Sequence, residues 1–163
     1  MTFLSYSFGL FFLAAAAVYH AAPRKLKPGI LLAASLVFYG WARPVFLILL
    51  AGEALAAYGF ALRLEKRDRP GRRIVFVASL AALLAPLLVF KYSDFLLQAF
   101  RPGGSGAILG LILPAGISFY TFKALSYVID VGRGRIAAER NPVLVGAYIT
   151  FFPQILAGPI ERA

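Results

Sequence analysis

The chain has no cysteine, a single histidine and few acidic residues, and each shortage excludes a kind of site. Without cysteine there can be no disulfide, no thiolate nucleophile and no metal site with Cys ligands. His20 by itself cannot form a histidine-rich metal site, and we expect it to be an interfacial residue with no catalytic role. The sequence therefore predicts neither a bound metal nor a cofactor.

Charged residues are also few, and hydrophobic residues are correspondingly abundant. Only 15% of the 163 residues are charged, whereas 61% are hydrophobic, and the mean hydropathy is +0.79. A soluble domain has about 45–50% apolar and about 25% charged residues. In water such a chain would expose more apolar surface than one small core can bury. We therefore expect an integral membrane protein with a single transmembrane domain, residues 1–163.

Six apolar runs predict an all-α, polytopic membrane fold, because backbone that crosses lipid must satisfy its own hydrogen bonds. Several runs are shorter than the ~20 residues that span a hydrocarbon core, and the second and third are alternatively one helical hairpin. Pro86 predicts a kink in the fourth run. The runs cover about residues 3–19, 29–41, 44–62, 74–90, 108–129 and 142–156.

The basic residues predict the orientation of these helices. The first, third and fifth connections hold twelve Lys and Arg residues, whereas the second and fourth hold three. Short cytoplasmic loops are enriched in Lys and Arg, so we expect the N-terminus outside. The net charge of +10 then fits lipid headgroups as partners, not nucleic acid. A cleavable signal peptide is the alternative for the first run, although its positive charges follow the apolar stretch instead of preceding it.

Polar residues within the apolar runs are the candidate site. Glu53 lies near the middle of the third run, where a carboxyl is costly: it serves either helix packing or the polar wall of a substrate or proton path. In the fifth run, Pro114 and Gly116 weaken the helix start before a polar stretch. That stretch is either an aromatic packing helix with a snorkelling Lys123 or a broken helix beside a polar cavity. Its candidate residues are Ser118, Tyr120, Thr121 and Lys123.

The sixth run ends in a stretch rich in proline and glycine. Pro153 is expected to break the helix at the outer side of the bilayer, and residues 158–159 predict a turn. The stretch is either an exit loop or the lip of a cavity. Its candidate residues are Gln154, Gly158, Pro159, Glu161 and Arg162. We expect one cavity to be lined by Ser118, Thr121, Gln154 and Arg162, because each would be costly against lipid.

These two stretches resemble the membrane-bound O-acyltransferase (MBOAT) family. The similar residues are 113–122, continuing through 126–131, and 151–154 with 157–160. Residues 35–41 and 90–92 resemble the same branch of the family. That branch is the bacterial one that acetylates alginate and other exported polysaccharides, related to the D-alanyl transfer protein of teichoic acids. The similarity spans nearly the whole chain.

The resemblance implies that the chain is the N-terminal part of a helical ring in the bacterial cytoplasmic (inner) membrane. There an acyl group, expected to be acetyl, passes from a donor on the cytoplasmic side to a hydroxyl of an exported polysaccharide. Other proteins of the acetylation machinery are further expected partners. The family's catalytic histidine lies in its later half, so no residue here is expected to be catalytic, and the chain alone is expected to be inactive. Lys123 stands where many relatives have Gln.

Two functions of other classes remain open. A transporter or channel subunit would also combine broken helices with intramembrane charge, but it predicts an inverted repeat that the sequence does not show. A small membrane scaffold or assembly partner predicts no polar cavity behind Ser118 and Gln154.

Overall fold

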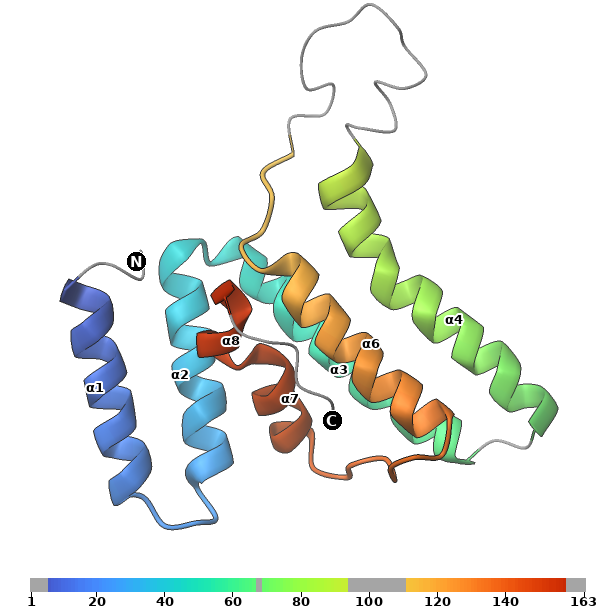
Figure 1. Cartoon of the computed structure of the whole chain (residues 1–163), viewed down its shortest axis with the longest axis horizontal. Coiled ribbons are helices and arrows are strands. Elements are labelled where there is room, and N and C mark those ends of the chain that lie inside the picture. The colour runs from blue at the N-terminus through green and yellow to red at the C-terminus, as the bar shows by residue number, and fades with distance from the viewer. Residues whose placement is uncertain (1–5, 67–68, 94–110, 158–163) are drawn as a thin grey trace, which may run out of the picture.

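The computed structural model describes residues 6–66, 69–93 and 111–157, which are almost entirely helical (Figure 1). No strand occurs in these ranges, so the all-α prediction is confirmed. The helices are α1 (Tyr6–Ala21), α2 (Lys27–Ala42), α3 (Val45–Lys66), α4 (Arg69–Leu87), the π-helix η1 (Leu88–Tyr92), α6 (Ile117–Gly132), α7 (Pro142–Thr150) and α8 (Phe152–Ala157).

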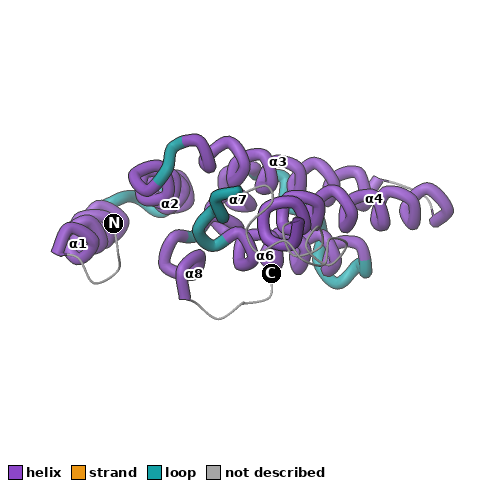
Figure 2. Tube along the Cα trace, turned by 90° about the horizontal axis from the view of Figure 1, so that it is seen from above, coloured by secondary structure: helices purple, strands orange, loops and turns teal. Residues whose placement is uncertain are grey.

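Successive long helices run in alternating directions, with α3 at the centre of the molecule (Figure 1). Helix α3 contacts α2, α4, α6 and α7, whereas α1 lies at one edge and has no buried residue. Viewed from above, α1 and α4 lie at opposite ends of an elongated arrangement (Figure 2). The α1–α2 and α6–α7 connections, the end of α3 and the start of α4 all lie at the same end (Figure 1). The described basic residues of the first, third and fifth connections therefore belong to one end of the fold.

A buried stripe with three alanines at its centre lets α3 pack closely against its neighbours. The stripe alternates steps of four and three residues, which keeps it on one face of the helix. Small side chains at such positions let helix backbones approach each other within a membrane. Its fully or almost fully buried members are Leu50, Ala54, Ala57, Ala61 and Leu64.

Helix α4 changes its winding just after Pro86. The sequence predicted a kink at Pro86. The structure instead shows that the helix continues to Leu87 and then widens into the π-helix Leu88–Tyr92. Proline has no N–H, so the carbonyl of Ala82, four residues earlier, lacks its usual helical donor. The wide turn is the local adjustment that follows this lost hydrogen bond.

The helix in the fifth apolar run begins later than expected, and the helix in the sixth run ends earlier than expected. Residues 111–116 are irregular, and α6 begins at Ile117 after Gly116 adopts a left-handed conformation with φ of 71°. In the sixth run the break falls at Phe151, two residues before Pro153. Pro153 cannot donate to the carbonyl of Ile149 and its ring would clash there, so α7 must end before it.

Two helical stretches are long and apolar enough to cross a membrane, Val45–Lys66 and Gly71–Tyr92, each of 22 residues. Large apolar side chains also cover the outer faces of the helices. Soluble monomers rarely expose such continuous apolar surface, so these are the features of a membrane protein. The six-span count remains a prediction. Among the exposed side chains are Leu10, Leu13, Ile48, Leu55, Ile74 and Val77.

At the basic end, hydrogen bonds tie the α6–α7 connection to α3 and α4. Arg140 forms an ion pair with Glu65 at 2.6 Å, and its carbonyl accepts from the Tyr58 hydroxyl at 2.9 Å. The Arg72 guanidinium donates to the carbonyl of Val131 at 2.9 Å. The connection is therefore held in place by polar contacts, away from the apolar middle of the molecule.

We predict that Gly132→Ala destabilises the fold. A Cβ at this position would lie 2.5 Å from Cδ2 of Phe76, where α6 crosses α4, so the ring would have to move. Overpacking of this kind costs about 1–3 kcal/mol. The free energy of unfolding in detergent is the measurement. Gly59→Ala, whose added Cβ would meet nothing within 4 Å, is the control and should be neutral or stabilising by up to about 1 kcal/mol. Equal losses in both variants would contradict the prediction.

We also predict that Lys25 and Arg43, both exposed, lie on opposite sides of the membrane. Because the native chain has no cysteine, Lys25→Cys and Arg43→Cys each provide a unique label site. A membrane-impermeant maleimide should label Arg43→Cys in intact cells and Lys25→Cys only after permeabilisation, since basic ends favour the cytoplasm. Labelling of both from outside would overturn this orientation.

Candidate functional site

Helix α6 directs its polar side chains to three different neighbours. Ser118 accepts a hydrogen bond from Nζ of Lys91 at 3.1 Å, which links α6 to the π-helix. Thr121 is fully buried and faces Glu53 of α3. Lys123, only 2% exposed, turns toward α8. Thr121 and Lys123 are therefore buried and Ser118 is partly buried, so Lys123 does not snorkel to the surface.

Lys123 and Gln154 form the polar contact between α6 and α8. The Lys123 ammonium donates to Oε1 of Gln154 at 2.5 Å, and its Nζ lies 4.7 Å from the ring centroid of Tyr148 and 5.8 Å from that of Phe151. A charge-assisted hydrogen bond and two aromatic faces are the partners that an ammonium needs when it leaves water. The helix break at Phe151 places the Gln154 side chain within hydrogen-bonding distance of Lys123.

A cavity of about 310 Å³ opens beside this pair. Its wall is mainly apolar and aromatic, with the amine of Lys27 near its basic end. Such a space suits an apolar group that carries a few polar atoms. Its lining includes Tyr19, Leu31, Lys123, Tyr148, Phe151 and Gln154.

Two more contacts join segments that lie far apart in the sequence. The backbone N–H of Phe152 donates to Oγ of Ser35 at 3.2 Å, across 117 residues. The hydroxyl of Tyr39 donates to the carbonyl of Ala115 at 2.8 Å. Three of the segments whose sequences carry the family resemblance, around residues 35–41, 113–122 and 151–154, therefore meet in one region.

Glu53 forms a second polar group in the interior. It is 4% exposed, and neither carboxyl oxygen has a hydrogen bond. The hydroxyls of Thr121 and Tyr120 are also buried without a hydrogen bond, although Thr121 faces the carboxyl. The carboxyl lies beside a cavity of about 440 Å³ between α3 and α4.

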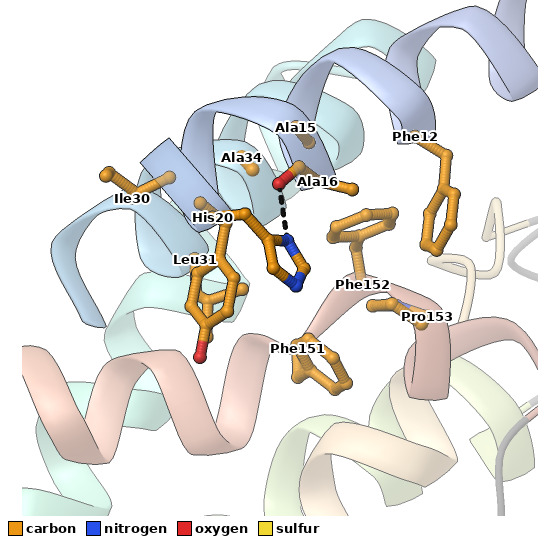
Figure 3. Close-up of a pocket in the computed structure, with 11 residues that line it drawn as sticks. Phe12, Ala15, Ala16, His20, Ile30, Leu31, Ala34, Phe151, Phe152 and Pro153 are labelled. Atoms are coloured by element: carbon orange, nitrogen blue, oxygen red, sulfur yellow. Dashed lines mark hydrogen bonds between the residues drawn. The ribbon is translucent and has the colours of Figure 1, made fainter. Parts of the chain in front are cut away.

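A third, almost entirely apolar cavity of about 250 Å³ lies between α1, α2 and the α7–α8 break. Figure 3 shows the His20 ring at its edge, with Nδ1 donating to the carbonyl of Ala16 at 2.9 Å. The second ring nitrogen is turned toward the cavity floor near Phe151 and Phe152 (Figure 3). Among the described residues, the His20 ring also meets the ring of Tyr19 edge to face, with centroids 5.5 Å apart.

The structure does not bring together all the residues that we expected to share a cavity. The cavity beside Gln154 has Lys123 in its wall, not Ser118 or Thr121, because these three side chains leave α6 in different directions. Arg162 lies outside the described residues, as do Gly158, Pro159 and Glu161. Tyr120 is fully buried, and its hydroxyl faces Tyr39.

Some residues of the site were not singled out from the sequence. Ser35, Tyr39 and Tyr148 all contact it, and Ser35 and Tyr39 lie in residues 35–41, which resemble the family. Only this resemblance could have identified Ser35 and Tyr39 from the sequence, since a serine or a tyrosine in an apolar helix does not by itself indicate a functional site. In the part of the chain that the structure describes, no three His, Asp or Glu side chains are grouped to hold a metal ion.

Comparison with known proteins finds relatives that match most of the chain. The probable alginate O-acetylases AlgI of Pseudomonas putida and Pseudomonas aeruginosa are 36% and 35% identical to it over 154 residues, or 89% of the chain. The peptidoglycan O-acetyltransferase of Helicobacter pylori is 30% identical over 158 residues, or 80% of the chain. The resemblance to the MBOAT-type O-acetyltransferases is confirmed.

The chain spans only about a third of the length of these relatives: 32% of the Pseudomonas putida protein, 29% of the Pseudomonas aeruginosa protein and 30% of the Helicobacter pylori protein. No family model matches the chain, and no solved structure matches it significantly. The arrangement of its helices is therefore known from the structure described above.

We predict that Gln154→Leu destabilises the protein by about 1.5–3 kcal/mol, because the buried Lys123 ammonium loses a charge-assisted acceptor. Lys123→Met on the same background should recover part of the loss, since an apolar side chain needs no acceptor. The free energy of unfolding of the two single variants and the double variant gives the coupling energy. Strictly additive effects would show that the two side chains do not interact.

Proposed function

We propose that the chain is part of a membrane-bound O-acyltransferase that moves an acetyl group onto hydroxyls of an exported polysaccharide. In this proposal it forms one transmembrane domain, residues 1–163, and supplies the N-terminal portion of the helical ring. It resides in the bacterial inner membrane with six spans and its N-terminus outside. The acyl donor, the polysaccharide and other acetylation proteins are its proposed partners.

The observation that carries the proposal is the meeting of three of the resembling segments. Their contacts are Ser35 with Phe152 and Tyr39 with Ala115, and Lys123, which directly follows one of the segments, bonds to Gln154 of another. Segments that are similar to O-acetyltransferases and distant in sequence would not need to meet if the similarity reflected apolar composition alone. Their convergence is what a shared functional centre requires.

The cavity beside Lys123 and Gln154 is the proposed wall of the acyl-transfer path. An apolar, water-poor space protects a reactive acyl group from hydrolysis. An ammonium fixed in such a space stabilises negative charge that develops on an acyl oxygen. We assign Lys123 and Gln154 to this wall. Ser118, Tyr120, Thr121, Gly158, Pro159, Glu161 and Arg162 are further proposed channel residues.

The general base is not among the residues assigned to this wall. The one histidine, His20, contacts Ala16 and apolar side chains, and the family resemblance places the catalytic histidine elsewhere. We therefore expect the purified 163-residue chain to transfer no acetyl group by itself. Turnover that survives His20→Ala would show that another group in this chain performs the chemistry.

We predict that Gln154→Ala, introduced in the cells that make this protein, lowers acetylation of their exported polysaccharide about tenfold. The reason is that a misplaced Lys123 costs about 1.4 kcal/mol of transition-state stabilisation, which corresponds to that factor. The measurement is the acetate released from the purified polysaccharide by mild base, normalised to the amount of the protein in membranes.

The matched control is Arg73→Ala, which removes an exposed charge from α4, a helix that contributes no residue to the cavity lining, and should leave acetate unchanged. Deletion of the gene sets the lower limit. Unchanged acetylation of every exported polysaccharide after deletion would overturn the proposed function. Equal acetate in wild type and Gln154→Ala would overturn the role assigned to Gln154.

A further inference from the structure

The apolar cavity of about 250 Å³ between α1, α2 and the α7–α8 break has no role in the function proposed above. Its wall residues converge from these three segments (Figure 3). The cavity is partly open, and two of its wall residues, Phe12 and His20, are exposed. Protein interiors are normally filled, because side chains around a void lose packing contacts. A space of this size beside an edge helix with no buried residue is therefore suited to an occupant from outside the fold.

Each of the two helices contributes one face to this cavity. The wall residues of α1 follow one another at steps of three, one, three and one residues, which keeps them on one side of the helix over about 12 Å. On α2 the wall residues also share one face, and Lys27 lies on that face one turn before them. Alanines at three of these positions create the space. The α1 residues are Phe12, Ala15, Ala16, Tyr19 and His20, and the α2 residues are Ile30, Leu31 and Ala34.

Positive charge is concentrated at one end of this cavity. The α1–α2 connection holds Arg24, Lys25 and Lys27, and no acidic residue precedes Glu53 in the sequence. Nζ of Lys27 lies 4.8 Å from the ring centroid of Tyr19, a wall residue, so one ammonium is at the mouth of the cavity. The ion pairs found among the described residues involve none of the three cations. They are therefore available to an anion from outside the chain.

An apolar slot with cations at one end is complementary to a lipid with a negative headgroup. An acyl chain gains free energy by covering apolar walls, and basic residues beside a membrane attract anionic lipids. A zwitterionic headgroup has no net charge to balance the three cations. A peptide would bring backbone N–H and C=O groups, for which an almost entirely apolar wall provides no partners.

We propose that this cavity binds one acyl chain of an anionic phospholipid, whose phosphate lies against Lys27 and the neighbouring cations of the α1–α2 connection. The chain fills the space left by the alanines and so adds apolar contacts between α1 and α2. The site shares Tyr19, Leu31 and Phe151 with the cavity beside Lys123, but it does not depend on the acyl transfer proposed above.

The test is native mass spectrometry of the full chain in dodecyl maltoside, titrated with dioleoyl phosphatidylglycerol. One molecule should bind about tenfold more tightly than dioleoyl phosphatidylcholine, because its headgroup carries a net negative charge. Lys27→Gln should weaken the binding of phosphatidylglycerol about fivefold, the contribution of one basic residue at an anionic surface. Ala15→Leu should weaken it about tenfold, since the larger side chain occupies the space of the acyl chain.

Lys66→Gln and Ala17→Leu are the matched controls and should bind like the wild type. The first removes an exposed cation from the same end of the fold, at the end of α3. The second adds the same volume to an exposed position of α1 that does not line the cavity. Equal affinity for the two lipids would overturn the proposal, as would Lys27→Gln and Ala15→Leu binding phosphatidylglycerol as tightly as their controls.

Photo-crosslinking locates the lipid without any variant, so it remains decisive if Ala15→Leu fails to fold. Phosphatidylglycerol with a diazirine in one acyl chain should label residues 12–20 or 30–34 of the native chain. Label confined to other segments would overturn the site. Glycerophosphoglycerol, the same headgroup without acyl chains, should not compete for labelling, and competition by it would show that the chain binds the phosphate alone.

Discussion

The arrangement of the site depends on one hydrogen bond, from the backbone N–H of Phe152 to Oγ of Ser35. The helix ends at Phe151 because of Pro153, so Phe152 starts a new helix with an N–H that has no helical acceptor. At membrane depth such a group is tolerated only against protein or trapped water. Ser35, which is fully buried and donates to Leu31 in its own helix, provides the acceptor.

This contact fixes α8 against α2, and two consequences follow. Gln154 comes to lie opposite Lys123, so the buried ammonium has its acceptor. Phe152 also enters a cluster of aromatic rings that holds α1, the helix with no buried residue, against the rest. The rings around it are those of Phe8, Phe11, Phe12 and Phe38. A broken helix thus organises both the polar pair and the edge of the fold.

Much of the fold was predictable, because long apolar runs in a chain with few charges can hardly be anything but helices. The residues at which those helices begin and end were harder to predict. Gly116 sets the start of α6 and Phe151 the end of α7, and both depend on backbone geometry that composition does not reveal. Lys123 and Gln154 were identified as candidates, but their pairing was not, since it requires knowing the angle at the break. The expected cavity failed to unite Ser118, Thr121 and Gln154 for the same reason.

Polar groups on α6 face three different helices, and this explains how a helix rich in polar residues remains inside the protein. Each polar side chain needs its own partner when water is excluded, and one shared cavity would leave them to compete for few acceptors. Ser118 is bonded by Lys91, and Lys123 is bonded to Gln154. Thr121 and Glu53 face each other without a hydrogen bond, so the interface of α3 with α6 is the one whose polar groups are incompletely satisfied. The same close packing that stabilises the centre of the molecule thereby leaves one buried carboxyl, that of Glu53, without a hydrogen-bond donor.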